Sequence, residues 1–348
     1  MRTVTRLVAL GLIITACSGE AESVDTTNST TEPTTTTTSA TSTTHAPTTT
    51  TTEPALLSPI NGLPVDDPDL LERRVLAVKI DNHPRARPQS GIEEADMVIE
   101  LMVEGITRFI SVWHQSDADY LGPMRSGRPT DASLLPAFNK PTFAISGAQG
   151  WVQQMLRSNG IPLIKELSPG TFRIGARRAP HNLYVNTIEL RAHADNQGYP
   201  DDPPPGPIWQ FGPFADAAPP VSTVRIDFSG NSVVWTWDAE TSLWLRSASG
   251  VESHWRNLDG EGGRIGVPVL VALYTDLYSV NGLPSSRTLG SGQALVFADG
   301  KVATGSWSRQ GETDWFELTH QDGEPILVPA GKVWVSLVPS HRGLTFEG

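Results

Sequence analysis

Short apolar runs, separated by turn-forming residues, dominate the chain beyond residue 58. In the first half of this region, continuous apolar runs typical of buried strands are mixed with runs that have helical spacing. The segments at 97–103 and 107–114 are joined by a short turn, which predicts a hairpin. Other strands are expected at 75–80 and 142–146, helices at 131–138 and 151–158, and a helical turn that Ser90 caps, with Glu93 three residues later.

Beyond residue 220 the pattern changes to alternating strands joined by polar turns. Asp299-Gly300 is a favourable two-residue hairpin turn. Strands are expected at 224–228, 233–237, 243–245, 267–274, 293–298, 301–307 and 333–338. We therefore predict an α+β fold with an N-terminal mixed α/β domain at 58–200, a proline-rich connector at 201–220, and a mostly antiparallel β domain at 221–348.

The first residues of the chain have the features of a bacterial lipoprotein signal. Two arginines, Arg2 and Arg6, precede an apolar stretch at 7–14, and the only cysteine, Cys17, follows it. A transmembrane helix needs roughly 20 apolar residues, so this stretch is too short to span a bilayer, whereas it suits a signal peptide. We predict a signal peptide at 1–16 and a lipid on Cys17 that anchors the mature chain outside the cytoplasm, to the bacterial cell membrane. The alternative is an ordinary secretory signal or an uncleaved anchor.

A threonine-rich segment follows the cysteine. Between residues 26 and 52, 17 of 27 residues are Thr, and no apolar residue is larger than Ala. Such a composition cannot bury a core, and its prolines favour extended polyproline conformers. We predict that 17–57 is a disordered tether between the lipid and the folded part.

The cysteine count and the net charge limit the kinds of chemistry and the partners that the protein can have. With Cys17 acylated, the mature chain has no cysteine for a disulfide, a nucleophile or a metal ligand. The formal net charge is −12, and removal of Arg2 and Arg6 with the signal changes −12 to −14. A surface of this charge repels nucleic acid. The sequence therefore excludes cysteine chemistry, indicates no nucleic-acid partner and suggests no cofactor.

Polar residues that suit binding chemistry gather in the first half of the folded region. The planar guanidinium of arginine donates two parallel hydrogen bonds to a carboxylate or a phosphate. We therefore expect a groove for an anionic ligand, lined by candidates from three segments: Asp81, Asn82, His83, Arg125, Arg128, Asp131, His181 and Asn182.

Structural roles compete with this interpretation. Arg125, Arg128 and Asp131 are close enough in sequence to form an ion-pair network that fixes a loop to the sheet. The two histidines, His83 and His181, suit capping or core positions equally well. No HExxH motif is present, and no metal site is expected.

Catalytic signatures are also missing. Glu100 and Glu104 lie on one strand face about 13 Å apart if the strand continues, too far for a shared acid and base unless the turn at Glu104 brings them together. GxSxG, SxxK and Walker motifs are absent, and Ser126 has no sequence-adjacent base. We therefore expect a binding protein rather than an enzyme.

Seven tryptophans lie between Trp235 and Trp334. Aromatic faces stack on sugars, so these rings fit either a glycan-binding surface or a core. Trp235 and Trp237 are two residues apart and share one strand face, which is ordinary in a packed hairpin. We expect core positions; a row of solvent-facing rings would favour glycan binding.

Four stretches of the chain, at 78–89, 122–131, 180–184 and 290–309, resemble the YerB-like lipoproteins. The resemblance covers nearly the whole folded region. It implies an exported bacterial lipoprotein with two conserved halves, each classed as a domain of unknown function. It supplies no reaction, so the candidate residues above are family hallmarks without assigned roles.

The leading functional hypothesis is a lipid-anchored extracytoplasmic protein that binds an anionic ligand or a cell-envelope component in the Arg/His/Asn-lined groove. The first alternative is an envelope hydrolase or transferase acting on wall glycan or peptide, with His181 or His83 as general base. The second is a scaffold that docks an envelope protein, which predicts an exposed apolar patch on the β domain and no polar cleft.

Overall fold

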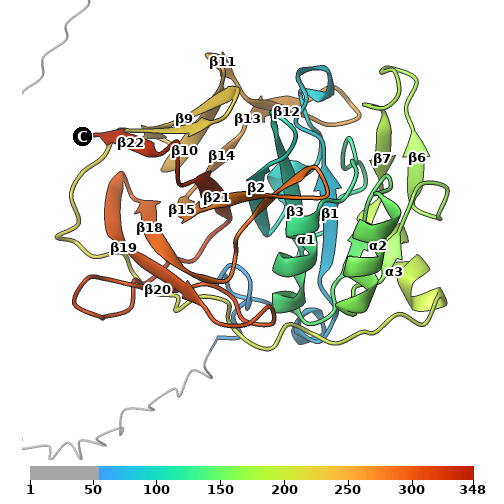
Figure 1. Cartoon of the computed structure of the whole chain (residues 1–348), viewed down its shortest axis with the longest axis horizontal. Helices are drawn as coiled ribbons and strands as arrows, with labels where there is room; N and C mark the ends of the chain where they lie inside the picture. The colour runs from blue at the N-terminus through green and yellow to red at the C-terminus, as the bar shows by residue number, and fades with distance from the viewer. Residues whose placement is uncertain (1–54) are drawn as a thin grey trace, which may run out of the picture. The chain divides into compact units, whose positions relative to one another are not determined.

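A ten-stranded mixed sheet runs through the part of the protein that the computed structural model describes, residues 55–348 (Figure 1). The predicted signal peptide at 1–16, the predicted lipidation site Cys17 and the predicted tether up to residue 54 lie outside the described residues. In spatial order the strands are β20 (Glu317–Thr319), β19 (Lys301–Arg309), β18 (Gly290–Ala298), β15 (Val269–Thr275), β21 (Val333–Pro339), β2 (Met97–Met102), β3 (Thr107–Trp113), β1 (Leu76–Ile80), β4 (Thr142–Ala144) and β5 (Leu163–Ile164).

Both predicted segments, 58–200 and 221–348, contribute strands to this sheet, and they meet at β21. This strand is parallel to β2 of the first segment and to β15 of the second. All its residues are buried, in agreement with an apolar run that occupies the middle of a sheet covered on both faces. Antiparallel pairs predominate elsewhere in 221–348, and β21 is the exception to the predicted antiparallel character.

A second sheet and several hairpins complete the β structure. The second sheet contains β11 (Val251–Glu252), β10 (Leu243–Ala248), β9 (Asn231–Asp238), β8 (Thr223–Phe228) and β22 (Leu344–Glu347), and β14 (Gly266–Val267) pairs with β10. The hairpins are β6 (Thr171–Arg173) with β7 (Leu183–Val185), β12 (His254–Arg256) with β13 (Gly262–Arg264), and β16 (Leu277–Val280) with β17 (Leu283–Ser286).

The α-helices are few: α1 (Pro129–Leu134), α2 (Gly150–Ser158) and α3 (Thr187–Asn196), with 3-10 turns η1 (Pro68–Leu71), η2 (Pro84–Ala86), η3 (Ile92–Glu94) and η4 (Leu135–Phe138). No helix among the described residues is both long and apolar enough to cross a membrane. The coarse α+β prediction fits, with strands far more abundant than helices.

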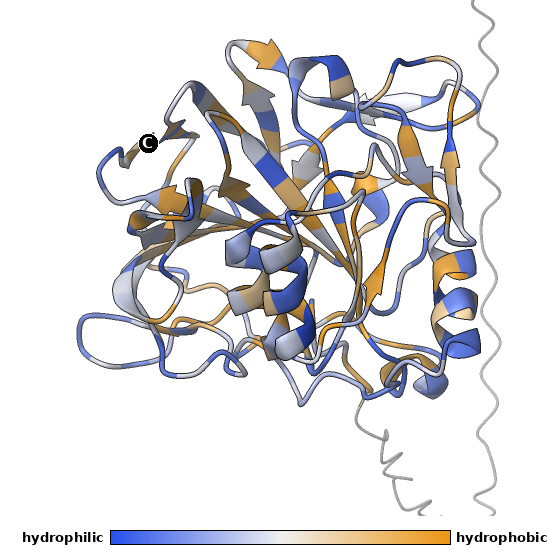
Figure 2. Ribbon diagram, turned by 45° about the vertical axis from the view of Figure 1, so that its right-hand side comes forward, coloured by the Kyte–Doolittle hydropathy of each residue, from blue (hydrophilic) through white to orange (hydrophobic). Residues whose placement is uncertain are grey.

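Two hydrophobic cores lie on opposite faces of the large sheet, because successive strand residues point to opposite sides. Ala77, Ile99 and Val335 belong to the core that α1, α2 and the connector cover. Their neighbours Val98 and Trp334 belong to the core beneath α3 and the second sheet. Figure 2 shows the apolar positions concentrated on the strands between these layers.

One local prediction was correct in part and another was wrong. The helix expected at 131–138 begins at Pro129 and changes to the 3-10 turn η4 after Leu134. Pro136 explains this, because proline has no N–H and its ring disfavours a continued α-helix. Ser90 does not cap a helical turn: η3 begins after Gly91, whose φ is 73°, and Ser90 instead pairs with Gly122.

The proline-rich connector has no regular secondary structure, but it is packed against the fold. Ile208 and Trp209 are buried in the first core, and the Ile208 N–H donates to the Pro59 carbonyl. At the start of the described chain, Val65 N–H donates to the Leu56 carbonyl. Residues 55–57, expected to belong to the tether, are therefore attached to the folded part.

The expectation that most C-terminal tryptophans are core residues is confirmed. Trp237 and Trp255 are partly buried, and the other five are buried: Trp235, Trp244, Trp307, Trp315 and Trp334. The described residues in this half therefore show no row of solvent-facing tryptophans.

A buried ion pair links the two sheets. Glu100 of β2 and Arg246 of β10 are fully enclosed, and Arg246 Nη2 donates to Glu100 Oε1 at 2.7 Å. The guanidinium carbon of Arg246 lies 5.3 Å from the centre of the Phe109 ring and 5.4 Å from that of Trp334, within cation–π range. Trp334 Nε1 donates to Glu100 Oε2, so both carboxylate oxygens are satisfied.

We expect Arg246→Met to lower the free energy of unfolding by about 3–5 kcal/mol, because it leaves the Glu100 carboxylate buried without its cation. The control is Lys140→Met, which breaks the exposed pair between Lys140 and Asp202 and costs less than about 1 kcal/mol. Chemical denaturation of both variants measures the difference. Similar small losses in the two variants would show that the buried pair has no special role.

Candidate functional site

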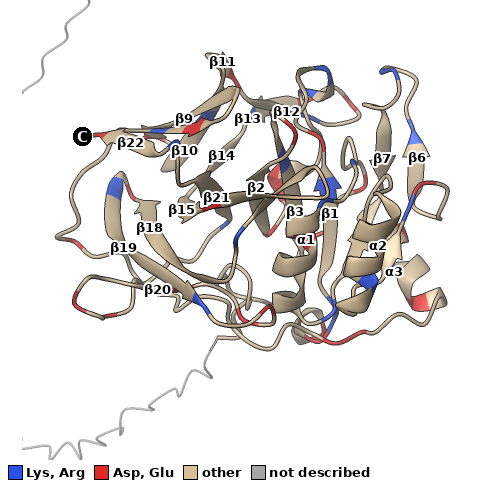
Figure 3. Cartoon of the chain, viewed as in Figure 1, with Lys and Arg blue, Asp and Glu red and all other residues tan. Residues whose placement is uncertain are grey.

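The candidate residues come together where β1 ends. β1 and β4 are parallel neighbours, and ligands in open sheets often bind beyond the carboxyl ends of parallel strands. The 122–128 segment runs along this edge: Arg125 N–H donates to the Lys79 carbonyl, and Ser146 N–H donates to the Arg125 carbonyl. Arg125 is thereby fixed between the ends of the two strands. Figure 3 shows the charged positions on the fold.

Asp81 is the centre of the cluster. Its carboxylate is buried, and Oδ2 lies 2.7 Å from His181 Nδ1 and 3.3 Å from Arg125 Nε. Its other oxygen, Oδ1, accepts from the His83 backbone N–H. Because an ionised carboxylate can only accept a hydrogen bond, Nδ1 of His181 carries the proton in this contact. The other ring nitrogen, Nε2, forms no hydrogen bond with the described residues.

His83 stacks on His181, with ring centres 4.6 Å apart and planes at 18°. Its Nδ1 accepts from the Arg85 N–H and so caps η2, as the structural interpretation of this residue anticipates. Burial, followed by the neighbouring His181, lowers the pKa of His83 below its usual 6.5. His83 is therefore mostly neutral at pH 7.

The two asparagines are used within the fold. Asn82 is buried, accepts from Arg87 and Gln89, and donates to Thr107 Oγ1 at 2.7 Å. Asn182 accepts from Arg173 and donates to the Ile174 carbonyl, which holds the β6–β7 hairpin. Both amides thus have hydrogen-bond partners within the protein.

The sequence predicted ion pairs among Arg125, Arg128 and Asp131 themselves. In the structure, each of these three side chains instead forms its ion pair with a residue outside 125–131. Arg125 contacts Asp81, and Arg128 donates to Glu104 Oε1. Asp131 contacts Lys79 Nζ at 2.6 Å, and both side chains are fully buried. Burial lowers the pKa of Lys79 to about 8, although Asp131 opposes this shift.

The two glutamates singled out in the sequence do not form a catalytic pair. Glu100 lies in the buried ion pair on the face toward the second sheet, whereas Glu104 lies in the exposed turn between β2 and β3. Thr107 connects the buried pair with the site, since its hydroxyl accepts from Asn82 and donates to Glu100.

Arg108 is a residue of the cluster that the candidate set lacked. It is 6% exposed, donates from Nη1 to the Ser126 carbonyl, and its Nε has no acceptor among residues 55–348. In that part of the chain no acidic oxygen lies within ion-pair distance of it. Burial and then the charge of Arg128 lower its pKa to about 10.

Arg108 and Lys79 project from the same face of the sheet, because Lys79 pairs with Ile110 and Arg108 is two residues before Ile110. The cluster therefore contains four cationic side chains and three carboxylates. Three cations pair with one carboxylate each, Lys79 with Asp131, Arg125 with Asp81 and Arg128 with Glu104, and the fourth, Arg108, has no acidic partner. The site has one buried positive charge more than its own acids neutralise.

Two family matches cover most of the folded region. Residues 60–200 match the N-terminal domain, and residues 224–335 the C-terminal domain, of a protein family of unknown function, DUF3048. The chain belongs to the DUF3048 family. All the candidate residues from Asp81 to Asn182 lie in the N-terminal match.

Two comparisons extend the family assignment. The chain is 28% identical over 303 residues to the Bacillus subtilis (strain 168) protein named "Putative lipoprotein YerB", which covers 82% of this chain and 86% of that protein. It is also similar to the crystal structure of the YerB protein from Bacillus subtilis, with a TM-score of 0.72, 24% identity, and coverage of 84% of this chain and 100% of that one. The resemblance to YerB-like proteins predicted from the four sequence stretches is confirmed.

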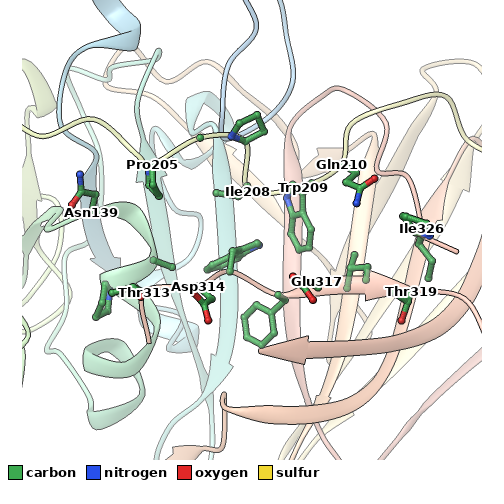
Figure 4. A pocket seen from close by; sticks show the side chains of 18 residues that line it. Asn139, Pro205, Ile208, Trp209, Gln210, Thr313, Asp314, Glu317, Thr319 and Ile326 are labelled. Atoms are coloured by element: carbon green, nitrogen blue, oxygen red, sulfur yellow. The ribbon is translucent and has the colours of Figure 1, made fainter. Parts of the chain in front are cut away.

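A cavity of about 840 Å³ lies elsewhere in this DUF3048 fold, between the connector and the 313–319 segment (Figure 4). Trp209 and Trp315 line it, but they are only 5% and 7% exposed, and their rings meet edge to face. Acidic Asp314 and Glu317 line it as well, and no basic residue does. The cavity therefore suits neither ring stacking on a sugar nor an anion.

The described residues contain no group of three or more His, Cys, Asp or Glu side chains placed to hold a metal ion.

We expect Asp131→Asn to destabilise the fold by about 3–5 kcal/mol at pH 7, because Lys79 stays buried without its acid. The loss shrinks as the pH rises toward 8. Without Asp131 the pKa of Lys79 falls further below 10.5, so the folded state holds fewer protons than the unfolded chain and stability increases with pH.

Urea denaturation at a series of pH values measures this change. The control is Asp202→Asn, which removes the exposed acid beside Lys140 and changes stability little at any of these pH values. A loss in Asp131→Asn that stays constant with pH would contradict the assignment to Lys79.

Proposed function

We propose that this protein is a lipid-anchored, extracytoplasmic binding protein whose Asp81–Arg125–His181 cluster holds the phosphate or carboxylate group of an envelope component. The observation that carries the proposal is the excess charge at Arg108, a buried guanidinium without an acidic partner in the described chain. A buried charge is costly unless it is paired, so an anion bound here gains a partner already in place.

Arg125 is the residue best placed to contact the ligand. Its Nε lies 3.3 Å from Asp81 Oδ2 but is buried without a hydrogen-bond partner among residues 55–348, and part of its side chain reaches solvent. Arg108 supplies further positive charge to the cluster, and Asp81 Oδ2 contacts His181 Nδ1 and lies close to Arg125 Nε. Because the Arg125 backbone is fixed by hydrogen bonds to Lys79 and Ser146, its guanidinium loses less freedom when it binds an oxyanion.

Anchoring to the outer face of the cell membrane through a lipid on Cys17 is part of the same proposal. The lipobox-like sequence before Cys17 supports it, as does the printed name of the Bacillus subtilis relative, which describes a lipoprotein. A threonine-rich tether would then hold the folded part near the membrane and allow it to reach envelope components.

The Asp81–His181 pair favours a second candidate, a hydrolase or transferase. A carboxylate that orients Nδ1 leaves Nε2 to act as a general base. Against it, no hydroxyl of the described residues is hydrogen-bonded to His181, so a nucleophile would have to be water or a substrate group.

The test is calorimetric titration of the full chain with inorganic phosphate and with phosphate-bearing wall fragments. We expect Arg125→Gln and Arg108→Gln each to weaken binding by roughly tenfold or more, since charge-assisted hydrogen bonds are lost. Arg256→Gln, an exposed change of equal charge on β12, leaves binding unchanged.

Unchanged binding in Arg125→Gln and Arg108→Gln, together with reduced stability, would make these arginines structural and contradict the proposal. New products from the wall fragments, lost in His181→Asn, would favour the second candidate instead.

A further inference from the structure

A separate cleft of about 560 Å³ lies between the N-terminal and C-terminal family segments. Its walls come from the loop before β2, the loop that carries Tyr120, the β6 strand with Phe172, and the turn between β12 and β13. That turn is held in place because the Arg256 N–H donates to the Gln89 carbonyl. The cleft shares no lining residue with the Asp81 cluster.

The inner surface of the cleft is aromatic and apolar. Tyr120 stacks on Tyr184 with centres 4.5 Å apart, and the Phe172 ring lies 6.1 Å from Tyr120 with the planes at 25°. Phe172 is 36% exposed and Leu258 is 73% exposed, so apolar surface remains accessible at the mouth. Aromatic faces of this kind attract organic cations as well as alkyl chains.

The remaining charged lining is acidic. Glu94, Asp119 and Asp259 line the cleft, and no lysine, arginine or histidine does. Within the described chain, none of these three carboxylates forms an ion pair. Both side chains are exposed, but partial burial of Glu94, and then the charge of Asp119, raises the pKa of Glu94, so these two carboxylates repel each other across the site.

Two basic residues whose charges act on Glu94 and Tyr120, Lys332 and Arg177, have hydrogen-bond partners outside the cleft. Lys332 Nζ donates to the Ile92 carbonyl, and the Arg177 guanidinium donates to the carbonyls of Ala86 and Pro88. Neither side chain lines the cleft. The charge of Lys332 partly opposes the raised pKa of Glu94, but neither Glu94 nor Asp119 has an ion-pair partner within the described chain, so both carboxylates can accept a cation from outside.

We propose that this cleft binds the lysine or arginine side chain of a polypeptide partner. The alkyl stem lies along Phe172 and Leu258, and the cationic head lies between Glu94 and Asp119. The volume is typical of sites for small organic groups, and the exposed apolar mouth suits a side chain presented by another chain. Charge complementarity selects a basic partner for an acidic protein.

The test uses the full chain and two short capped peptides, acetyl-Gly-Lys-Gly-amide and the same peptide with Nε-acetyllysine. Calorimetry measures affinity, and saturation-transfer NMR shows which peptide protons contact the protein. We expect the lysine peptide to bind roughly tenfold or more tightly than the acetylated one, because acetylation removes the charge.

The double variant Glu94→Gln/Asp119→Asn weakens binding of the lysine peptide by roughly tenfold. A matched control, Glu240→Gln/Asp216→Asn, removes two exposed acids elsewhere and leaves binding unchanged. Phe172→Ser lowers affinity without changing the preference for lysine over acetyllysine. Thermal unfolding of each variant checks that the fold is retained.

Equal binding of the two peptides, or equal affinity of the acidic-cleft variant and its control, would overturn the proposal. Binding of methylammonium as tight as that of the lysine peptide would overturn the assignment to a polypeptide side chain. The cleft shares no lining residue with the Asp81 cluster, so none of these outcomes depends on the anion site.

Discussion

The buried pair of Glu100 and Arg246 is the interaction on which the rest of the structure depends. It joins β2 of the large sheet to β10 of the second sheet inside a cage of aromatic rings. The same carboxylate accepts from Thr107, which in turn accepts from Asn82 at the edge of the candidate site. One buried charge pair thus fixes the packing of two sheets and the base of the polar cluster.

Most individual elements of the fold could be predicted from the sequence, and their arrangement could not. The apolar runs at 75–80, 97–103 and 107–114 and the Asp299-Gly300 turn identify strands and hairpins because these signals are local. The insertion of β21 between β2 and β15 depends on pairing between distant segments, which periodicity does not encode. For the same reason, two segments with different patterns share one sheet.

The grouping of the candidate residues could be predicted in part from the sequence. Motif spacing brought Asp81, Arg125 and His181 into one hypothesis, and the structure places them in contact. Their role as ligand-binding residues stays a prediction. Arg108 was not among the candidate residues, although a cation inside a fully buried strand was a signal. Its significance appears only in the structure, where each nearby carboxylate contacts another cation. Ion-pair partners come from distant segments, so spacing within 125–131 did not reveal them.

The most direct test of the central claim is a double-mutant cycle between Glu100 and Arg246, measured as free energies of unfolding. The account predicts that Glu100→Gln/Arg246→Met loses less stability than the two single changes added together, by about 2 kcal/mol or more, because the double variant leaves no buried charge unpaired. Losses that add within about 0.5 kcal/mol would contradict it, since the two side chains would then contribute independently.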